Sequence, residues 1–384
     1  MKIAVTGGGS GGHLSPALAV IQKIREFKPQ AKILYIGGRL GMENTNQPSI
    51  EQEVIPQTDI PHVFIYAGKL QRRWAISSVF LLIGAIPGFL QALFYLSRFK
   101  PAVLFSTGGY VSVPVVFSAW LLRVPVIIHE QTATVGLSNK IGARFAREVY
   151  VSFASSVRHF PAGKTSVSGN PLRSEIVAVM NKQRRIEKHQ QQQQLPMLYI
   201  TGGAQGSHFI NKTVEEILSK LLEKYRLIWQ CGDNHRYRDF MRLKRMRENL
   251  PDQLNEHLKL VKYVGPEDIG DVFHQADLVV GRSGANTVNE IMALGLPAIF
   301  IPIPWVTNNE QYKNARILVN AGSAVILSEN QLNGESLLKT INEVMDNYDE
   351  YWQKAEAIRA SCKLHAAEFL AQKILAYGSN KTNC

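Results

Sequence analysis

The stretch GRSGANTVNEIMALGLPAIFIPIPWVTNNEQYKN, residues 281–314, indicates the fold of the chain around it. An apolar run at 277–280 leads into a turn of small residues, after which apolar side chains recur at helical spacing. Gly295 and Pro297 end that helix, and 298–303 is another apolar run typical of a buried strand. The stretch therefore predicts a strand, a helix and a second strand, the repeating unit of α/β folds.

The same stretch carries side chains suited to a nucleotide sugar. A turn of small residues before a helix leaves backbone N–H groups at the positive end of the helix dipole, where a phosphate binds well. Glu290 follows about two turns into the helix, where a carboxylate can accept hydrogen bonds from ribose hydroxyls. Gln311 and Asn314 lie on one helical face and suit sugar hydroxyls. An ordinary α/β unit whose glycines serve only packing is the alternative.

Composition limits the classes of protein that fit. The chain has 384 residues, which is enough for two α/β domains, and its first residues predict a strand, not a secretory signal. Three cysteines without metal-ligand spacing argue against a disulfide framework and favour the reducing cytoplasm. The net charge of +12 favours an anionic partner. We expect no nucleic-acid partner, because no basic stripe interleaved with aromatic residues occurs.

A glycine-rich turn, GGGSGGH at 7–13, follows the first apolar run at 2–6. Its spacing fits a dinucleotide fingerprint, which also requires an acid at the end of the second strand. The second predicted strand, 32–36, is followed by GGR, and this disfavours a nicotinamide or flavin cofactor. A turn of this kind still accepts a diphosphate. His13 beside it is a candidate general base, although most histidines are structural.

Similar turns follow other predicted strands, at 103–106 and 125–128. Because ligands of open parallel sheets bind outside the carboxyl ends of the strands, we expect these turns to form one cleft with residues 10–13. Tyr110, Glu130 and Asn139 are the candidates there. Residues 148–153 are predicted to be the last strand of this domain, and the proline-bounded turn after it would carry Arg173 into the cleft.

Residues 74–96 form a long uncharged stretch, flanked by basic residues at 69, 72, 73, 98 and 100. Its length approaches the roughly 20 apolar residues of a membrane-spanning helix. We exclude a span, because strands of one predicted sheet lie on both sides of the stretch. Two buried helices broken at Pro87 are one alternative. We favour the other, a partly exposed apolar patch with a basic rim that rests on an acidic bilayer.

Residues 181–196 contain a run of glutamines and no apolar periodicity, so they predict a solvated loop or linker. From 197 the pattern restarts, with a strand at 198–201, the turn GGAQGS, a helix at 208–222 and further strands at 227–231, 258–264, 277–280, 298–303 and 324–327. We therefore predict an α/β fold with two Rossmann-like doubly wound domains facing across a cleft. The expected domains are 1–170 and 171–345, with helices at 346–384 that pack back on the first.

Together and in this order, the turns resemble those of the MurG family of peptidoglycan N-acetylglucosaminyltransferases, which have the two-domain GT-B architecture. The motifs are GGGSGGHLSPALAV, STGGYVS, HEQ with GLSNK, GNPLR, TGGAQGS and the 281–314 stretch, and they cover nearly the whole chain. The resemblance implies transfer of N-acetylglucosamine from UDP-N-acetylglucosamine to the muramoyl 4-hydroxyl of undecaprenyl-diphosphate-linked lipid I, giving lipid II. It also implies a peripheral protein on the cytoplasmic face of the inner membrane, with the 69–100 region against the anionic surface.

The resemblance assigns roles to individual residues. Domain 1–170 would bind the acceptor, with Ser10, Gly11, Gly12 and His13 at its diphosphate and the reaction centre. Domain 171–345 would bind the donor. There the resemblance implies that the Val264 backbone contacts the uracil and that Glu290 binds the ribose. The N-acetylglucosamine would contact Gln311 and Asn314. The residues implied at the diphosphate are Arg173, Ala285, Asn286 and Thr287.

Three positions depart from the family pattern. Thr132 stands where asparagine is usual, Ala204 replaces a serine, and Glu310 stands where glutamine is common. We keep Thr132 and Ala204 as substrate-contact candidates, with a shortened side chain at Thr132 and only the backbone N–H at Ala204.

We expect an inverting transfer that needs no metal and no cofactor, because the sequence has no D-x-D carboxylate pair. A helix N-terminus and Arg173 would balance the charge of the departing UDP instead. His13 is the first choice of base, and a role that only orients the acceptor is the alternative. Three rival classes are a related glycolipid synthase acting on diacylglycerol, an NAD-type oxidoreductase, and a non-catalytic binder of membranes or nucleic acid.

Overall fold

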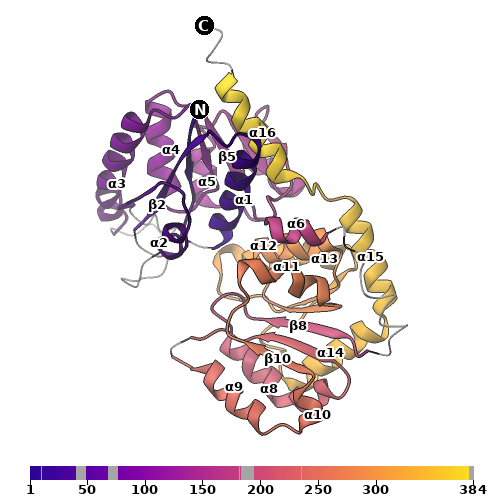
Figure 1. Ribbon diagram of the computed structural model, residues 1–384. Helices are drawn as coiled ribbons and strands as arrows, with labels where there is room; N and C mark the ends of the chain where they lie inside the picture. The colour runs from indigo at the N-terminus through magenta and orange to yellow at the C-terminus, as the bar shows by residue number, and fades with distance from the viewer. Residues whose placement is uncertain are drawn as a thin grey trace. The chain divides into compact units, whose positions relative to one another are not determined.

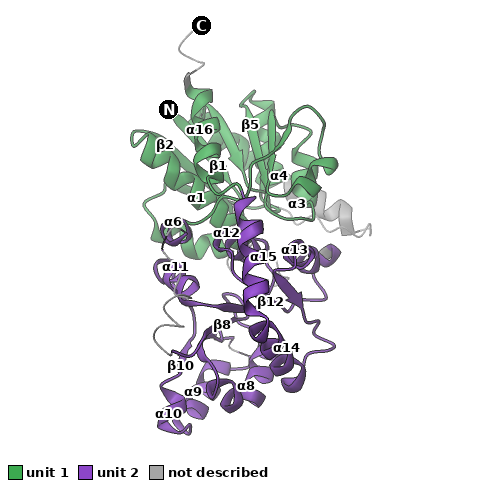
Figure 2. Cartoon of the chain, turned by 90° about the vertical axis from the view of Figure 1, so that its right-hand side faces the viewer, with its two compact units in different colours: residues 1–173, 363–384 green, residues 174–362 purple. Residues whose placement is uncertain are grey.

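A computed structural model describes residues 1–9, 11–39, 49–67, 77–180, 182, 194–234 and 236–379. They form two compact units, Met1–Arg173 with Lys363–Cys384, and Ser174–Cys362 (Figure 2). Each unit contains one parallel β-sheet flanked by helices (Figure 1). Ser10, residues 69–76 at the start of the expected membrane patch, and most of the expected linker at 181–196 lie outside the described residues.

The described part of unit 1 holds a seven-stranded parallel sheet in the order β3-β2-β1-β4-β5-β6-β7. Its strands are β1 Lys2–Thr6, β2 Lys32–Gly38, β3 His62–Ile65, β4 Val103–Ser106, β5 Val126–Glu130, β6 Glu148–Val151 and β7 Thr165–Val167. The prediction that 148–153 is the last strand was wrong, because β7 follows it. Both unpredicted strands, β3 and β7, are short edge strands with mostly half-buried side chains, so they lack a long apolar run.

Side chains of β1 alternate between two cores, as expected of a parallel strand covered on both faces. Ile3 and Val5 pack in a cluster with Leu370 of α16 (Ala366–Ser379) and with residues of α1 (Gly11–Phe27). Ala4 packs in a second cluster with Leu96 of α3 (Ser77–Phe99) and with α4 (Ser112–Leu121). The smaller helices of the unit are α2 Ile50–Val54, η1 Ile55–Gln57, α5 Leu137–Gly142 and η2 Ala154–His159.

Helix α3 is continuous through Pro87, so the alternative of two helices broken at that residue was wrong. A proline inside a helix removes one hydrogen bond and can bend the helix without ending it. No helix in the described part of the chain has the length and apolarity needed to cross a bilayer.

The described part of unit 2 holds a six-stranded parallel sheet in the order β10-β9-β8-β11-β12-β13. Its strands are β8 Met197–Thr201, β9 Arg226–Gln230, β10 Leu258–Val261, β11 Leu278–Gly281, β12 Ala298–Phe300 and β13 Ala324–Ile326. Its helices are α6 Ser174–Val179, α8 His208–Leu222, α9 Asp239–Glu248, α10 Asp252–Asn255, α11 Pro266–Gln275, α12 Ala285–Leu294, η3 Thr307–Asn309, α13 Glu310–Asn320, α14 Gly334–Asp346 and α15 Tyr348–Ala360.

The fold differs in detail from the expected division of the chain. The boundary between the units falls after Arg173, and the expected tail at 346–384 is shared between them. Helix α15 packs on α12 in unit 2, whereas α16 packs on α1 in unit 1. The predicted strand–helix–strand unit of the 281–314 stretch is confirmed as β11, α12 and β12, and α12 ends at Gly295, whose φ of 57° is left-handed.

Both sheets reverse their strand order at one point, between β1 and β4 in unit 1 and between β8 and β11 in unit 2. The helices that follow the two strands at such a point pack on opposite faces of the sheet. A crevice therefore lies between the carboxyl ends of those two strands. The sequence-predicted turns follow these four strands, which makes the two reversal points the places to look for a site.

The close approach of β8 and β11 yields a stability prediction. A β-carbon at Gly281 would lie 2.2 Å from the backbone oxygen of Thr201, whereas one at Gly284 would meet nothing within 4 Å. We expect Gly281→Ala to lower the free energy of unfolding by about 1–3 kcal/mol, because the strands must separate. Gly284→Ala is the control for a β-carbon that meets no neighbour, and its loss should be smaller, because only the preference for glycine over alanine at an N-cap opposes it. Chemical denaturation of both variants measures the difference, and equal losses would contradict this account.

Candidate functional site

The turns at the reversal point of unit 2 are held together by Arg282. Its guanidinium donates to Ser207 Oγ at 2.8 Å and to the Ile301 carbonyl at 2.9 Å, and it forms an ion pair with Glu329. Burial lowers the pKa of this guanidinium, and the neighbouring Glu329 carboxylate opposes the shift. An arginine stays protonated even so. One buried cation thus joins the turns that follow β8, β11 and β12.

Helix α12 starts at this point with the predicted phosphate cradle. Its N-cap is Gly284, which offers no side-chain acceptor to the N–H groups of the first turn, formed by Ala285, Asn286 and Thr287. Because such groups have no partner inside the helix, an anionic ligand can satisfy them. Glu290 lies further along the helix and is buried, with 2% of its surface exposed.

The predicted sugar-binding residues lie beside the same turn. Ser283 Oγ donates to the Gln311 carbonyl at 2.8 Å, and Asn314 Nδ2 donates to the Ser283 carbonyl at 3.3 Å. Gln311 Oε1 accepts from the Ile303 N–H at 3.0 Å. The structure therefore joins Gln311 and Asn314 to the turn before α12. Because the Gln311 oxygen holds the backbone, its Nε2 group is the part suited to a ligand.

Val264 is linked to the second glycine turn through Gln230, a residue that sequence reasoning missed. The Val264 N–H donates to Gln230 Oε1 at 3.1 Å, and Gln230 Nε2 donates to the Gly203 carbonyl at 2.7 Å. A base contact through the Val264 backbone would therefore use its carbonyl. Ala204 lies at the exposed tip of the same turn.

In unit 1, the turns after β1 and β4 are hydrogen-bonded to each other and fix His13. The Gly8 N–H donates to the Gly108 carbonyl at 3.2 Å, and Thr107 Oγ1 donates to the His13 carbonyl at 2.7 Å. His13 Nδ1 lies 2.8 Å from the Thr107 carbonyl, which can only accept, so Nδ1 carries the proton. In the neutral ring Nε2 is then a proton acceptor, as a general base requires. Gly11 and Gly12 form the start of α1.

The turn after β5 is organised by Glu130, which is 1% exposed. Its carboxylate accepts from the Thr132 N–H at 3.1 Å, Thr132 Oγ1 at 2.8 Å, the Gly136 N–H at 2.9 Å and Asn139 Nδ2 at 3.1 Å. Thr132 and Asn139 thus stabilise this turn through their hydrogen bonds to the Glu130 carboxylate. Tyr110 lies over the end of β2, since a β-carbon on Gly38 would be 2.0 Å from its hydroxyl.

Arg173 is the last residue of unit 1, so its expected contact with the donor phosphates stays a prediction. Among the described residues, no group of three or more His, Cys, Asp or Glu side chains is arranged to hold a metal ion.

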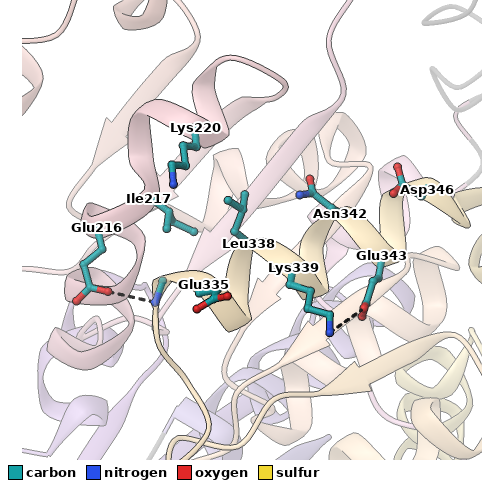
Figure 3. A pocket seen from close by; sticks show the side chains of 10 residues that line it. Glu216, Ile217, Lys220, Glu335, Leu338, Lys339, Asn342, Glu343 and Asp346 are labelled. Atoms are coloured by element: carbon teal, nitrogen blue, oxygen red, sulfur yellow. Dashed lines mark hydrogen bonds and ion pairs between the residues drawn. The ribbon is translucent and has the colours of Figure 1, made fainter.

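A groove between α8 and α14 lies apart from the predicted residues (Figure 3). Its charged groups are partly paired: Glu216 accepts from the Gly334 N–H at 3.1 Å, and Lys339 lies 3.8 Å from Glu343. The residues that line it are Glu216, Ile217, Lys220, Gly334, Glu335, Leu338, Lys339, Asn342, Glu343 and Asp346, none of them a predicted site residue. The candidate site therefore remains at the strand ends.

Two domain models match the chain. The glycosyltransferase family 28 N-terminal domain matches residues 3–151, and the glycosyltransferase family 28 C-terminal domain matches residues 197–372. The two matches divide the chain as its two sheets do.

Curated relatives share one name, UDP-N-acetylglucosamine–N-acetylmuramyl-(pentapeptide) pyrophosphoryl-undecaprenol N-acetylglucosamine transferase. The protein of Bacillus cytotoxicus is 37% identical over 350 residues, which cover 90% of this chain and 91% of the relative. That of Limosilactobacillus fermentum is 34% identical over 349 residues, covering 90% of each.

Solved structures confirm the fold. The crystal structure of Acinetobacter baumannii MurG superimposes with a TM-score of 0.73 at 24% identity, covering 98% of this chain and 99% of that one. The Streptomyces glycosyltransferase SsfS6, complexed with thymidine diphosphate, gives a TM-score of 0.62 at 14% identity over 98% of this chain and 99% of its own. Both likenesses extend over nearly the whole of each chain, so they support the fold of both units.

Buried His129 yields a prediction on pH. Nε2 lies 3.0 Å from the Gly169 carbonyl, and Nδ1 is buried without a partner among the described residues. Burial lowers the pKa of His129 to about 4. Below about pH 6.5 the unfolded chain therefore binds a proton at His129 that the folded protein does not bind. The free energy of unfolding decreases as the pH is lowered, by roughly 3 kcal/mol at pH 4.

We expect His129→Gln, which can still donate to the Gly169 carbonyl, to lose less stability than the wild type between pH 7 and 5. Thermal unfolding across that range measures this. His365→Gln, at a histidine whose side chain is 71% exposed, is the control and should follow the wild type. An unchanged slope in His129→Gln would show that another group causes the acid sensitivity.

Proposed function

Because this chain belongs to the MurG family of glycosyltransferases, we propose that it transfers N-acetylglucosamine from UDP-N-acetylglucosamine to lipid I, which produces lipid II for peptidoglycan synthesis. The observation that carries the proposal is the arrangement at the reversal point of unit 2. There the start of α12, the buried Glu290 and the linked pair Gln311 and Asn314 offer successive partners for a diphosphate, a ribose and a sugar.

The donor site also supplies a means of stabilising the leaving group. When the bond from the anomeric carbon to UDP breaks, negative charge collects on the diphosphate. Preorganised N–H groups at the start of α12 stabilise that charge without rearrangement. Arg173 is proposed to add a cation to the same diphosphate. We expect the transfer to need no metal, so chelator should leave turnover unchanged.

His13 is the proposed base. The acceptor 4-hydroxyl oxygen bonds to the anomeric carbon as its proton passes to His13 Nε2, and the bond to UDP breaks on the opposite side. The configuration of the sugar therefore inverts. The bond from Nδ1 to the Thr107 carbonyl supports this role, because it fixes the ring and leaves Nε2 to accept the proton.

Release of UDP tests the reaction. The wild type should release UDP from UDP-N-acetylglucosamine when a lipid I analogue is present and release little without it. His13→Ala should lower turnover by about 10²–10⁴-fold, the usual contribution of a general base, while UDP binding measured by calorimetry stays the same. Turnover with diacylglycerol in place of the lipid I analogue would favour the glycolipid-synthase alternative. Near-normal turnover of His13→Ala would remove His13 as the base.

Exposed apolar side chains support a peripheral position on an anionic membrane. Ile86, Leu90 and Phe94 are 53%, 56% and 56% exposed and lie four residues apart on one face of α3. On α4, Trp120 and Leu121 are 48% and 53% exposed. These five side chains are the apolar patch. The two helices meet where the rings of Phe89 and Phe117 lie 5.5 Å apart.

Basic residues accompany the apolar patch. Arg98, Lys100 and Arg123 are exposed at the ends of α3 and α4. Each cation near an anionic leaflet contributes about 1 kcal/mol. We therefore propose that the patch rests on the cytoplasmic face of the membrane, where a lipid-linked acceptor is found.

Vesicle binding tests the apolar patch. We expect Leu90→Gln with Phe94→Gln to weaken binding to anionic phospholipid vesicles by about 10-fold or more, since both side chains lose apolar contact with lipid. Phe209→Gln, at an exposed phenylalanine of α8, is the matched control and should bind as the wild type does. Co-sedimentation measures binding. Vesicle binding that survives the double substitution would place the membrane contact elsewhere.

A further inference from the structure

Glu51 is a buried carboxylate beside the first glycine turn. It lies on α2, and its residue surface is 0% exposed. Both of its oxygens accept from the Gly9 N–H at 3.0 Å, and Oε1 also accepts from the Gly38 N–H at 3.3 Å. The carboxylate therefore joins the turn after β1 to the end of β2.

The contact requires space that only glycine provides. A β-carbon on Gly8 would lie 2.0 Å from Glu51 Oε1. Ser49, just before α2, donates from Oγ to the Gly38 carbonyl at 2.6 Å and is also buried. The short helix is thus anchored at two points to the strand end.

Ionised carboxylates are costly to bury, and the charge of Glu51 needs compensation. Burial raises the pKa of the Glu51 carboxyl, while the Gly9 N–H and the charge of His13 lower it. Tyr35 of β2 and Tyr110 are the titratable hydroxyls beside it, and burial, the Glu51 charge and Tyr110 hold the pKa of Tyr35 well above the ordinary value. The Tyr35 hydroxyl donates to the Gly7 carbonyl. Among the described groups that act on the Glu51 carboxylate, His13 is the one that becomes positively charged when it takes up a proton.

We propose that Glu51 is a positioning residue of the transfer reaction, which fixes the glycine turn leading into α1 and stabilises the positive charge that His13 gains as base. This inference rests on the proposed function. Two features carry it. The carboxylate holds the N–H of Gly9, four residues before His13, and the same turn is tied through Gly8 to the segment that fixes the His13 ring.

The substitution Glu51→Gln keeps the shape but removes the charge and replaces one of the two acceptor oxygens with an NH₂ donor, so that a single oxygen is left for the Gly9 and Gly38 N–H groups. We expect turnover with the lipid I analogue to fall about 10-fold or more, because the imidazolium loses its counter-charge. The acidic limb of the pH–rate profile should move to lower pH. UDP binding by calorimetry should stay within about 2-fold of the wild type, which also verifies that unit 2 is folded.

Glu53→Gln is the matched control, on the same helix but exposed, and should behave as the wild type. Glu51→Asp keeps the charge and should retain more turnover than Glu51→Gln.

Failure of the inference and failure of the function are distinguishable. If the wild type does not release UDP with the lipid I analogue, the proposed function fails. If it does, and Glu51→Gln retains either wild-type turnover or the wild-type pH–rate limb, Glu51 is not a positioning residue for His13. Equal loss of turnover and UDP binding would also overturn the inference, because it would indicate general damage to the fold.

Discussion

The structure depends on how backbone N–H groups find acceptors where a parallel strand turns into a helix. Such groups have no partner within the helix. In unit 1 a carboxylate of the protein takes the Gly9 N–H, whereas in unit 2 the cap before α12 is Gly284, which brings no acceptor of its own. Two similar turns thus have opposite electrostatic character. The difference supports the proposal that an anionic donor binds in the second unit, where the buried Arg282 cation joins the turns around the start of α12.

Much of the fold could be predicted from the sequence because its central elements carry strong local signals. The α12 segment has helical apolar spacing with a glycine at its end, and the inner strands are continuous apolar runs. The edge strands β3 and β7 lack such runs and depend on pairing with a neighbour. Pro87 shows the limit of a local rule, because α3 continues through it.

The candidate site divides in the same way. Glu290, Gln311 and Asn314 could be proposed as site residues because they follow a recognisable turn at fixed spacing, and the structure brings the last two to Ser283. Glu51 and Gln230 could not, because each acts on a turn that is distant in sequence. A carboxylate does lie at the end of β2, that of Glu51, but it binds the Gly9 and Gly38 N–H groups and is therefore not the ribose ligand of a dinucleotide fingerprint. Such partners are determined by tertiary contacts, which no local pattern encodes.

The return of the chain to unit 1 limits how freely the two halves can be exchanged. Leu370 and Ile374 of α16 are fully buried in the same cluster as Ile24 of α1. A gene fragment that stops at Arg173 would leave this apolar side of α1 uncovered. Hybrid proteins that combine unit 1 of one homologue with unit 2 of another should therefore place one crossover after Arg173 and the other before Lys363, so that α16 stays with the unit that it completes.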